Sequence, residues 1–261
     1  MRIPRIYTEQ TLEPGQSIEL ETAAATHLAR VLRAQSGQPV ELFNGDGNNY
    51  AAELTEVGKR QVSLRVISRA ANPTESPLAL TLAQVISKGE RMDLVVQKST
   101  ELGVRRIIPL TSERCDVRLS SEREDKRIRR WQSIAQGAAE QCGRSVVPQI
   151  DEVIRLQDWL TATRDFDEQT LRLVLHHRNT TSLGDYSAPS EVVLLVGPEG
   201  GLSEQEIEAA HQAGFGAVAF GPRVLRTETA PLTGLSLCQY LWGDFGGASS
   251  SDPVQSPKRA Q

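Results

Sequence analysis

A glycine-rich turn between two regular elements is the segment of this chain best suited to bind a ligand. An apolar run over 192–196 has the length of a strand buried on both faces, and it leads directly into the turn. Ser203 and Glu206 then have the spacing of a capping box, which predicts a helix over 203–212. Glycines let a ligand approach the main chain closely, and free amides can bond to it. The turn consists of Gly197, Pro198, Glu199, Gly200 and Gly201. Alone, this pattern also fits a tight structural turn.

Two further loops favour the ligand interpretation. Residues 220–230 follow a short apolar run and hold glycine, proline, two arginines, a carboxylate and two hydroxyls. His176 and His177 stand at the end of another apolar run, 171–176, although a lone histidine is more often a surface or core residue than a catalyst. Because ligands of open α/β sheets bind outside the C-terminal ends of the strands, these loops predict one shared site.

The residue types disfavour several other chemistries. The turn lacks the Lys-Ser/Thr of a phosphate-binding loop and the GxGxxG spacing of a dinucleotide site. No magnesium carboxylates are evident, which leaves a nucleotide hydrolase as a weak alternative. Cys115, Cys142 and Cys238 are an odd number without metal-binding spacing, so we expect idle thiols, no disulfide framework and no metal site.

The elements that would position these loops alternate between strand and helix, which predicts an α/β domain with a mainly parallel sheet over 73–246. Apolar runs predict the strands, and amphipathic periodicity predicts the helices, the last with Pro231 in its first turn. The expected strands are 78–86, 107–110, 171–176 and 192–196, and the expected helices are 90–102, 122–141, 203–212 and 232–245.

The first 72 residues predict a smaller, β-rich unit. Asn-Gly and Asp-Gly within 44–49 supply the positive φ of a tight hairpin between strands at 40–43 and 50–54. Alternating polar and apolar residues predict a further strand over 61–67, and a short helix is expected over 24–34. The composition of 72–77 is that of a linker, which places a domain boundary at 72/73. The tail, 247–261, is rich in Ser, Pro and charge, and is expected to be disordered.

Composition and charge set the remaining limits. The chain of 261 residues is 39% hydrophobic, holds no apolar run long enough to span a membrane, and begins without a secretory signal, so we expect a cytoplasmic protein with no membrane partner. Its net charge of −4 is unfavourable for nucleic-acid binding. Residues 88–130, however, hold twelve Lys/Arg against eight Asp/Glu, which is compatible with an RNA-facing surface and equally with a solvated helix.

Motifs in these loops and elsewhere along the chain resemble those of a known family. The sequence closely resembles the RsmE family of ribosomal RNA uridine methyltransferases, members of the SPOUT superfamily. The resemblance covers nearly the whole chain up to about Gly246 and consists of seven motifs in the family's order. These motifs occupy residues 1–5, 27–33, 97–103, 112–115, 140–144, 197–202 and 225–230.

This resemblance implies an architecture and an activity. Residues 1–72 would form a PUA-like RNA-binding barrel, and 73–246 a SPOUT methyltransferase domain with a C-terminal trefoil knot. The protein would be a homodimer that uses S-adenosylmethionine to methylate N3 of one uridine in 16S rRNA within the small ribosomal subunit. The alternative from a different functional class is a non-catalytic RNA-binding ribosome assembly factor with the same fold.

The resemblance also assigns roles to residues, because the family holds its cofactor with three loops. The cofactor-binding residues expected here are Leu175, His176, His177, Leu195, Gly197, Pro198, Glu199, Gly200, Gly201, Phe220, Gly221, Leu225, Arg226 and Thr227. Uracil N3 must lose its proton before or during attack on a methyl group, which requires a base, or a cation that stabilises the developing anion. We assign Arg226 and Glu228 to these catalytic roles, with a structural clamp between the two as the alternative.

RNA contacts are expected from basic residues in both domains, since phosphate affinity comes from Lys and Arg. Arg144 is expected to approach the target base most directly, with the base flipped out of the RNA. The full set of expected RNA-binding residues is Arg2, Arg5, Arg30, Arg33, Lys88, Arg91, Lys98, Arg114 and Arg144.

Overall fold

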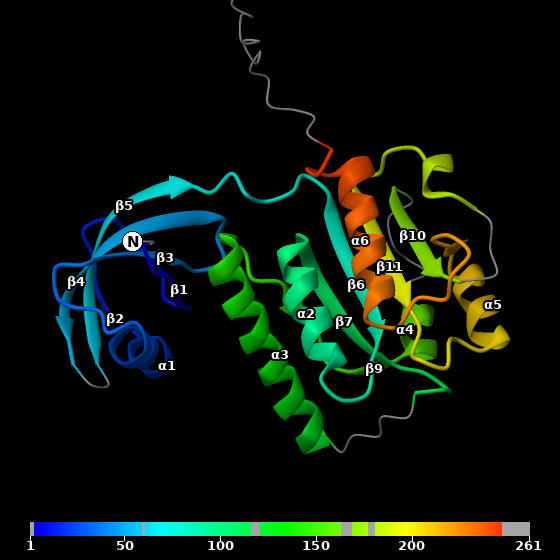
Figure 1. The fold of residues 1–261 in the computed structure, drawn as a ribbon, viewed down its shortest axis with the longest axis horizontal. Helices are drawn as coiled ribbons and strands as arrows, with labels where there is room; N and C mark the ends of the chain where they lie inside the picture. The colour runs from blue at the N-terminus through cyan, green and yellow to red at the C-terminus, as the bar shows by residue number, and fades with distance from the viewer. Residues whose placement is uncertain (1–2, 59–60, 116–120, 163–168, 177–180, 247–261) are drawn as a thin grey trace, which may run out of the picture.

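The chain forms two separate sheets. The computed structural model describes residues 3–58, 61–115, 121–162, 169–176 and 181–246. The first 71 residues contribute one sheet and the residues from 79 onward contribute the other, and Figure 1 shows the two lying one beyond the other along the longest axis. The boundary expected at 72/73 falls in the connection between these sheets. The tail expected to be disordered, 247–261, lies outside the described residues.

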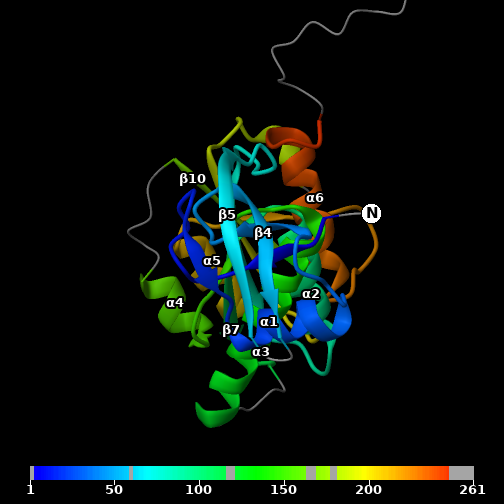
Figure 2. The same ribbon diagram turned by 90° about the vertical axis from the view of Figure 1, so that its left-hand side faces the viewer.

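The N-terminal sheet has the strand order β1-β3-β4-β5-β2. β3 and β4 pair in an antiparallel hairpin, and Gly45 and Gly47 in its turn have φ angles of 93° and 81°, as the Asn-Gly and Asp-Gly pairs predict. Figure 2 looks onto this sheet, with β4 and β5 as its two long strands. The strands are β1 (Arg5–Tyr7), β2 (Ser17–Glu19), β3 (Pro39–Phe43), β4 (Asn48–Val57) and β5 (Val62–Ala71).

The short helix of this unit differs from the expected one. It begins earlier, as α1 (Thr22–Thr26), and continues as a wider π-helical turn over His27–Val31. The backbone then reaches Arg33, whose φ of 51° lies in the left-handed region that a non-glycine residue rarely adopts. Leu28 is buried, whereas Val31 is 66% exposed, so the apolar spacing predicts only part of the buried face.

The larger sheet is parallel throughout the described residues, with the order β12-β10-β11-β6-β7-β8 and β9 paired to β7. The α/β class expected from the sequence is therefore confirmed. The two-residue strands β8 and β9 carry no periodicity and are not predicted. The strands are β6 (Ala79–Val85), β7 (Val104–Thr111), β8 (Gln149–Ile150), β9 (Ile154–Arg155), β10 (Thr170–Leu175), β11 (Glu191–Val196) and β12 (Gly216–Val218).

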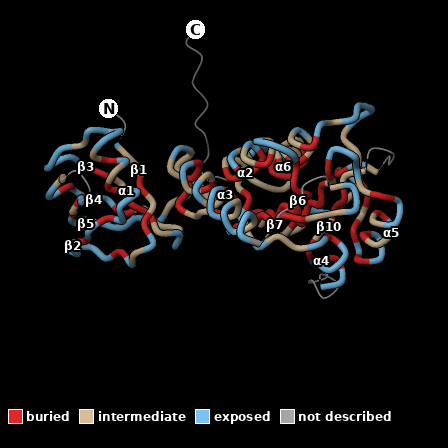
Figure 3. The backbone as a smooth tube through the Cα atoms, turned by 90° about the horizontal axis from the view of Figure 1, so that it is seen from below, coloured by how far each residue is buried: buried red, intermediate tan, exposed pale blue. Residues whose placement is uncertain are grey.

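Helices cover both faces of this sheet, and alternate residues of one strand enter two different cores. Leu194 packs with Trp131 and Leu235 on one face, while Leu195 packs with Trp159 and Ile207 on the other. Figure 3 shows the resulting buried layer in the sheet, with exposed residues on the outer turns of the helices. The helices are α2 (Arg91–Glu101), α3 (Ser121–Cys142) and α6 (Thr229–Trp242) on the first face, α4 (Leu156–Ala162) and α5 (Glu204–Gln212) on the second, and the 3-10 turn η3 (Leu183–Asp185).

Candidate cofactor site

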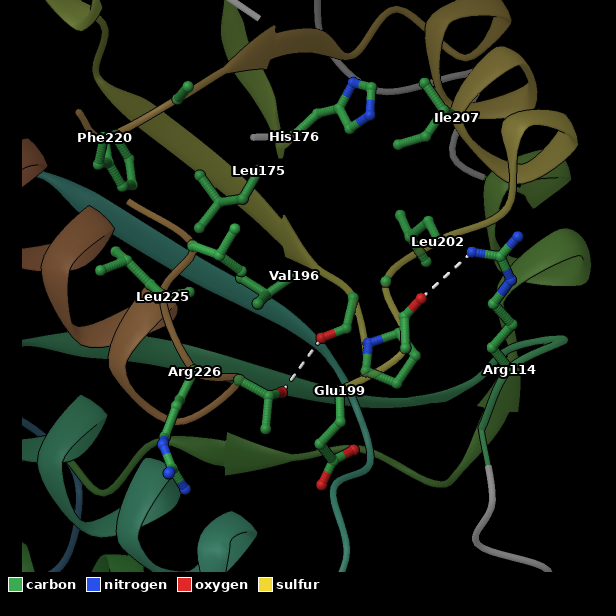
Figure 4. A pocket seen from close by; sticks show the side chains of 18 of the residues that line it. Arg114, Leu175, His176, Val196, Glu199, Leu202, Ile207, Phe220, Leu225 and Arg226 are labelled. Atoms are coloured by element: carbon green, nitrogen blue, oxygen red, sulfur yellow. Dashed lines mark hydrogen bonds between the residues drawn. The ribbon is translucent and has the colours of Figure 1, made fainter. Parts of the chain in front are cut away.

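Three parallel strands end at one cavity. The C-terminal ends of β10, β11 and β12 open onto a space of about 830 Å³, as expected for ligand sites of open α/β sheets (Figure 4). The structure brings most of the expected site residues together around it. Those that line the cavity are Leu175, His176, Gly197, Pro198, Glu199, Gly200, Gly201, Phe220, Gly221, Leu225, Arg226, Thr227 and Glu228. His177 lies outside the described residues.

One expected wall residue is misplaced. Leu195 is fully buried and packs against α4 and α5 in the sheet core, so it does not line the cavity. Side chains alternate along a strand, and the next residue, Val196, faces the cavity instead. The prediction of Leu195 as a cofactor contact is therefore wrong, because the strand residue that faces the cavity is the next one, Val196.

The glycine-rich turn is closed by its own backbone. The amide of Gly201 donates a 2.9 Å hydrogen bond to the carbonyl of Pro198, and Gly201 has a φ of 68°, a conformation that favours glycine. Ser203 then caps α5, with reciprocal bonds to Glu206 of 3.3 Å and 2.8 Å, as the capping-box spacing predicts. The turn is thus anchored at both ends while Glu199 and Gly200 remain exposed.

A buried polar relay links this turn to the loop before α6. The Thr227 hydroxyl donates to the Gly197 carbonyl at 3.1 Å (Figure 4), and the Gln84 side-chain amide donates to the Thr227 oxygen at 3.2 Å. Thr227 is 5% exposed, and Gln84 is fully buried at the end of β6. Gln84 was not among the expected site residues, because nothing local in the sequence marks a glutamine as adjacent to residues far along the chain.

Charged side chains connect the same two loops at the rim of the cavity. Arg91, at the start of α2, donates to Glu199 at 2.6 Å, and the Lys88 amide donates to the same carboxylate oxygen at 3.2 Å. Burial raises the pKa of Glu199, but the hydrogen bonds from its own amide, Lys88 and Arg91 outweigh burial and hold that pKa below its usual value. One oxygen of Glu228 lies 3.8 Å from the Arg91 Nε.

Apolar side chains form one side of the remaining cavity wall, and residues of α5 form the other side. Figure 4 shows Leu175, Val196, Phe220 and Leu225 grouped together, with Arg114 across the cavity from them. Several lining residues of α5 were missed, although their spacing places them on a single helical face. The missed residues of α5 are Glu204, Ile207, Glu208 and His211, and Leu202, which precedes the helix, was missed as well.

Sequence comparisons agree with this two-part architecture. The profile of an RNA methyltransferase domain matches residues 74–239, and that of an RNA methyltransferase PUA domain matches residues 20–67. Ribosomal RNA small subunit methyltransferase E of Buchnera aphidicola (Schizaphis graminum) is 34% identical over 94% of this chain and 98% of its own. The protein of the same name from Bacillus subtilis is 33% identical over 89% and 93%. The chain belongs to the ribosomal RNA small subunit methyltransferase E family. The family expected from the seven motifs is thus confirmed.

Two solved structures share this fold. A protein from Legionella pneumophila, solved in complex with the bound cofactor SAM, superposes with a TM-score of 0.89, at 43% identity over 94% of this chain and 100% of its own. Ribosomal RNA small subunit methyltransferase E from Neisseria gonorrhoeae, bound to S-adenosyl methionine, gives 0.87 at 41% identity over the same shares. The SPOUT-type and PUA-like fold expected for this family member is confirmed, while the trefoil knot stays a prediction.

The expected RNA-binding residues fall into different environments in this family member. Arg30, Arg33, Lys88 and Arg114 are exposed, and Arg114 also donates to the Gly200 carbonyl at 3.2 Å. Lys98 is partly buried and pairs with Glu101 at 2.7 Å. Arg2 lies outside the described residues.

Among the helices that the structure describes, none has the length and apolar character of a membrane span.

Arg144 is a structural residue, which corrects the expectation that it approaches the target base. It is 3% exposed, and its guanidinium donates to Glu75 at 2.8 Å and to the carbonyls of Thr100 and Val104, each at 2.8 Å. Its donors are therefore used inside the protein. The motif over 140–144 marks Arg144 as part of the family pattern, but a sequence motif does not show whether an arginine side chain faces the solvent or the core.

The expectation that Arg5 contacts RNA is corrected for the same reason. Its side chain is 10% exposed and forms an ion pair with Glu41. It also donates to the Arg144 carbonyl at 3.0 Å and to the Ser145 hydroxyl at 3.2 Å. Arg5 thus joins the N-terminal sheet to the segment that follows α3, and it does not present a guanidinium to RNA.

Proposed function

We propose that this chain is an S-adenosylmethionine-dependent methyltransferase that modifies N3 of one uridine in 16S rRNA. The observation that carries the proposal is the cavity at the ends of β10, β11 and β12, whose two glycine-bearing loops are joined by the Thr227–Gly197 hydrogen bond. Membership of the small subunit methyltransferase E family, in which a relative of 41% identity binds S-adenosyl methionine, supports this cofactor.

The cavity fits that cofactor in size and in chemistry. Leu175, Val196 and Phe220 provide an apolar wall against which an adenine can pack. The exposed turn around Gly200 allows close approach to main-chain groups. The Glu228 carboxylate at the rim complements the sulfonium and ammonium charges of the cofactor, whereas the Glu199 carboxylate is already paired with Arg91.

The bound cofactor supplies an electrophilic methyl group, and the chain must prepare the uridine to receive it. Neutral uracil carries a proton on N3, so a group near the cavity has to accept it. Glu228 suits this role because it lines the cavity and one of its carboxylate oxygens accepts no hydrogen bond. Arg226 is exposed at the cavity mouth, where its charge can stabilise the anion that develops on the uracil oxygens.

The geometry supports separate roles for these two residues over a clamp between them. Both are described, and no ion pair joins them, since the cation nearest the Glu228 carboxylate is Arg91. Arg226 thus keeps its guanidinium available at the mouth, and the assignment of separate roles to the two side chains is retained.

We further propose a homodimer as the working form, acting on rRNA within the small subunit. The C-terminal part of α6 and the residues after it leave large apolar and aromatic side chains exposed, a feature typical of subunit contacts. Tyr240 is 63% exposed, Leu241 42% and Phe245 51%. The N-terminal unit would then contribute one RNA-binding surface from each subunit, with Arg30 and Arg33 exposed on its helical turn and the residues that follow it.

The test uses small subunits from cells that lack the protein. Incubation with the purified chain and S-adenosylmethionine labelled in its methyl group should label the 16S rRNA, and mass analysis of digested nucleosides should identify uridine methylated at N3. Binding to the subunits without transfer of label would favour the assembly factor instead. Label on another base, or on protein, would overturn the proposed reaction.

A further inference from the structure

Arg91 occupies a position between the two cofactor loops. Its Nη1 lies 2.6 Å from Glu199 in the glycine-rich turn, and its Nε lies 3.8 Å from Glu228 in the loop before α6. The side chain is 39% exposed, so it stands at the rim of the cavity and not in the core. A single guanidinium therefore spans two carboxylates that belong to different loops.

The two carboxylates are held differently. Glu199 receives a second donor, the Lys88 amide at 3.2 Å, which fixes its orientation. The Glu228 oxygen nearest Arg91 has essentially no solvent exposure and accepts no hydrogen bond. At 3.8 Å the Arg91 Nε is close enough for attraction but too far for a hydrogen bond. The firm contact with Glu199 thus holds Arg91 just short of Glu228, whose buried oxygen accepts no hydrogen bond from it.

We infer that Arg91 is a positioning residue that sets the spacing of the two cofactor loops and the direction of the Glu228 carboxylate, and that it is not primarily an RNA contact. The part that concerns Glu228 rests on the proposed function. Without Arg91, the two carboxylates that each lie within 4 Å of its guanidinium would lose the cation between them, and their like charges would repel. The loops would separate, and both cofactor affinity and the methyl-transfer step would suffer.

An RNA contact and a positioning role predict different kinetics. A phosphate contact contributes to binding of the ribosomal substrate, so its loss raises KM for the small subunit and leaves cofactor affinity unchanged. A residue that spaces the cofactor loops acts before RNA arrives. Its loss weakens cofactor binding in the free protein and lowers kcat, with little change in KM for the subunit.

The experiment compares Arg91→Ala with Arg91→Lys, Glu199→Gln and the double variant Arg91→Ala/Glu199→Gln. Arg106→Ala is the matched control, because Arg106 forms an ion pair of 2.7 Å with Asp151 at the opposite end of the sheet. Cofactor affinity is measured by calorimetry without RNA. Amide hydrogen exchange of residues 197–202 and 225–230 is followed in the protein without added cofactor.

We expect Arg91→Ala to weaken cofactor binding about tenfold and to speed exchange in both loops, because groups in one charge network couple at this level. Glu199→Gln removes one of the two facing charges while keeping an oxygen that the Lys88 amide can bond. The double variant should therefore regain most of the lost affinity, and Arg91→Lys should retain part of it. Arg106→Ala should match the wild type in both measurements.

Two outcomes would overturn the inference. One is unchanged exchange and unchanged cofactor affinity in Arg91→Ala, with a raised KM for the small subunit. The other is an affinity loss that Glu199→Gln does not relieve. Failure of the proposed function has a different signature, because a wild-type chain that binds the cofactor and never methylates rRNA would leave the exchange and calorimetry results intact.

Discussion

The Thr227 hydroxyl donates a 3.1 Å hydrogen bond to the Gly197 carbonyl, thirty residues earlier in the chain. Gln84 supports this contact from β6 by donating to the Thr227 oxygen at 3.2 Å. Because the contact is buried, neither partner can exchange it for water without cost. The Thr227 side chain therefore joins directly the two loops that contain most of the expected cofactor residues.

Replacement of Thr227 by valine should weaken cofactor binding. The change keeps the shape of the side chain but removes the donor to the part-buried Gly197 carbonyl and the acceptor of one Gln84 N–H, while Gln84 Nε2 keeps its bond to the Val85 carbonyl. A loss of about 1–2 kcal/mol is expected, which corresponds to roughly a tenfold rise in the dissociation constant for S-adenosylmethionine by calorimetry. Thr233→Val on α6, where the hydroxyl bonds only to the Thr229 carbonyl, is the matched control. Equal affinities in the two variants would show that the relay does not hold the site.

Two adjacent glycines should respond differently to alanine. Gly201 has a φ of 68°, so an alanine there adopts a left-handed conformation and should cost about 1–2 kcal/mol of unfolding free energy. Gly200 has no such φ, and a Cβ added to it would meet the aliphatic part of Arg114 at 3.4 Å, an ordinary contact. Denaturation in urea should therefore separate Gly201→Ala from wild type while Gly200→Ala stays within about 0.5 kcal/mol. A larger loss of unfolding free energy in Gly200→Ala than in Gly201→Ala would contradict the left-handed conformation described for Gly201.

The sequence predicts those features that depend on the periodicity of apolar residues or on residues close by in the chain. Leu194 and Leu195 belong to a continuous apolar run, which indicates a strand buried on both faces, and the two residues do enter two different cores. The capping box at Ser203 and the hairpin glycines likewise depend on neighbours within a few residues. Because three such strands end in loops rich in glycine and polar side chains, the place of the site follows from the same reasoning.

The features that the sequence does not predict depend on contacts between distant segments. Gln84 and Thr227 are 143 residues apart, and only the sheet order brings them together. Arg144 and Arg5 have the residue type of an RNA contact, yet their partners lie in the other domain or in the core. The family resemblance alone places Leu195 at the cavity, and period-two alternation fixes which residues share a face but not which face meets the ligand.

Arg144→Ala should unfold more easily than wild type instead of losing only its activity on RNA. The variant removes the donor that Arg144 supplies to the partly buried Glu75 carboxylate and to the carbonyls of Thr100 and Val104, of which Thr100 keeps the Gly103 amide. Removal of one partner of a buried ion pair costs about 3 kcal/mol or more. Denaturation midpoints in urea, analysed with a common slope, measure this loss. Cofactor affinity of the fraction that remains folded should be close to that of wild type.

The control for that prediction is Arg106→Ala, which breaks an exposed ion pair with Asp151. Pairs of this kind contribute at most about 1 kcal/mol, so the two arginine variants should differ clearly. An Arg144→Ala protein as stable as Arg106→Ala, yet inactive on small subunits, would restore Arg144 as an RNA contact.

Glu140→Gln should change how stability depends on pH. Burial raises the pKa of Glu140, although the hydrogen bond it accepts from the Tyr7 amide at 3.0 Å and the charges of His27 and Arg5 act in the opposite direction. The folded protein therefore binds this proton more tightly than the unfolded chain does. Stability then falls as pH rises from the ordinary value of 4.5 through the raised pKa of the folded state, since the ionised carboxylate is the form that burial disfavours.

A glutamine keeps the oxygen that accepts from Tyr7 and cannot ionise, so the variant should lack this fall. The measurement is the difference in unfolding free energy between variant and wild type at several pH values. That difference should grow in favour of the variant across the window above pH 4.5 and then level off. Glu53→Gln, at an exposed position on β4, controls for loss of one negative charge. A constant difference between Glu140→Gln and wild type would mean that the joint between the N-terminal sheet and α3 admits enough water to solvate the carboxylate.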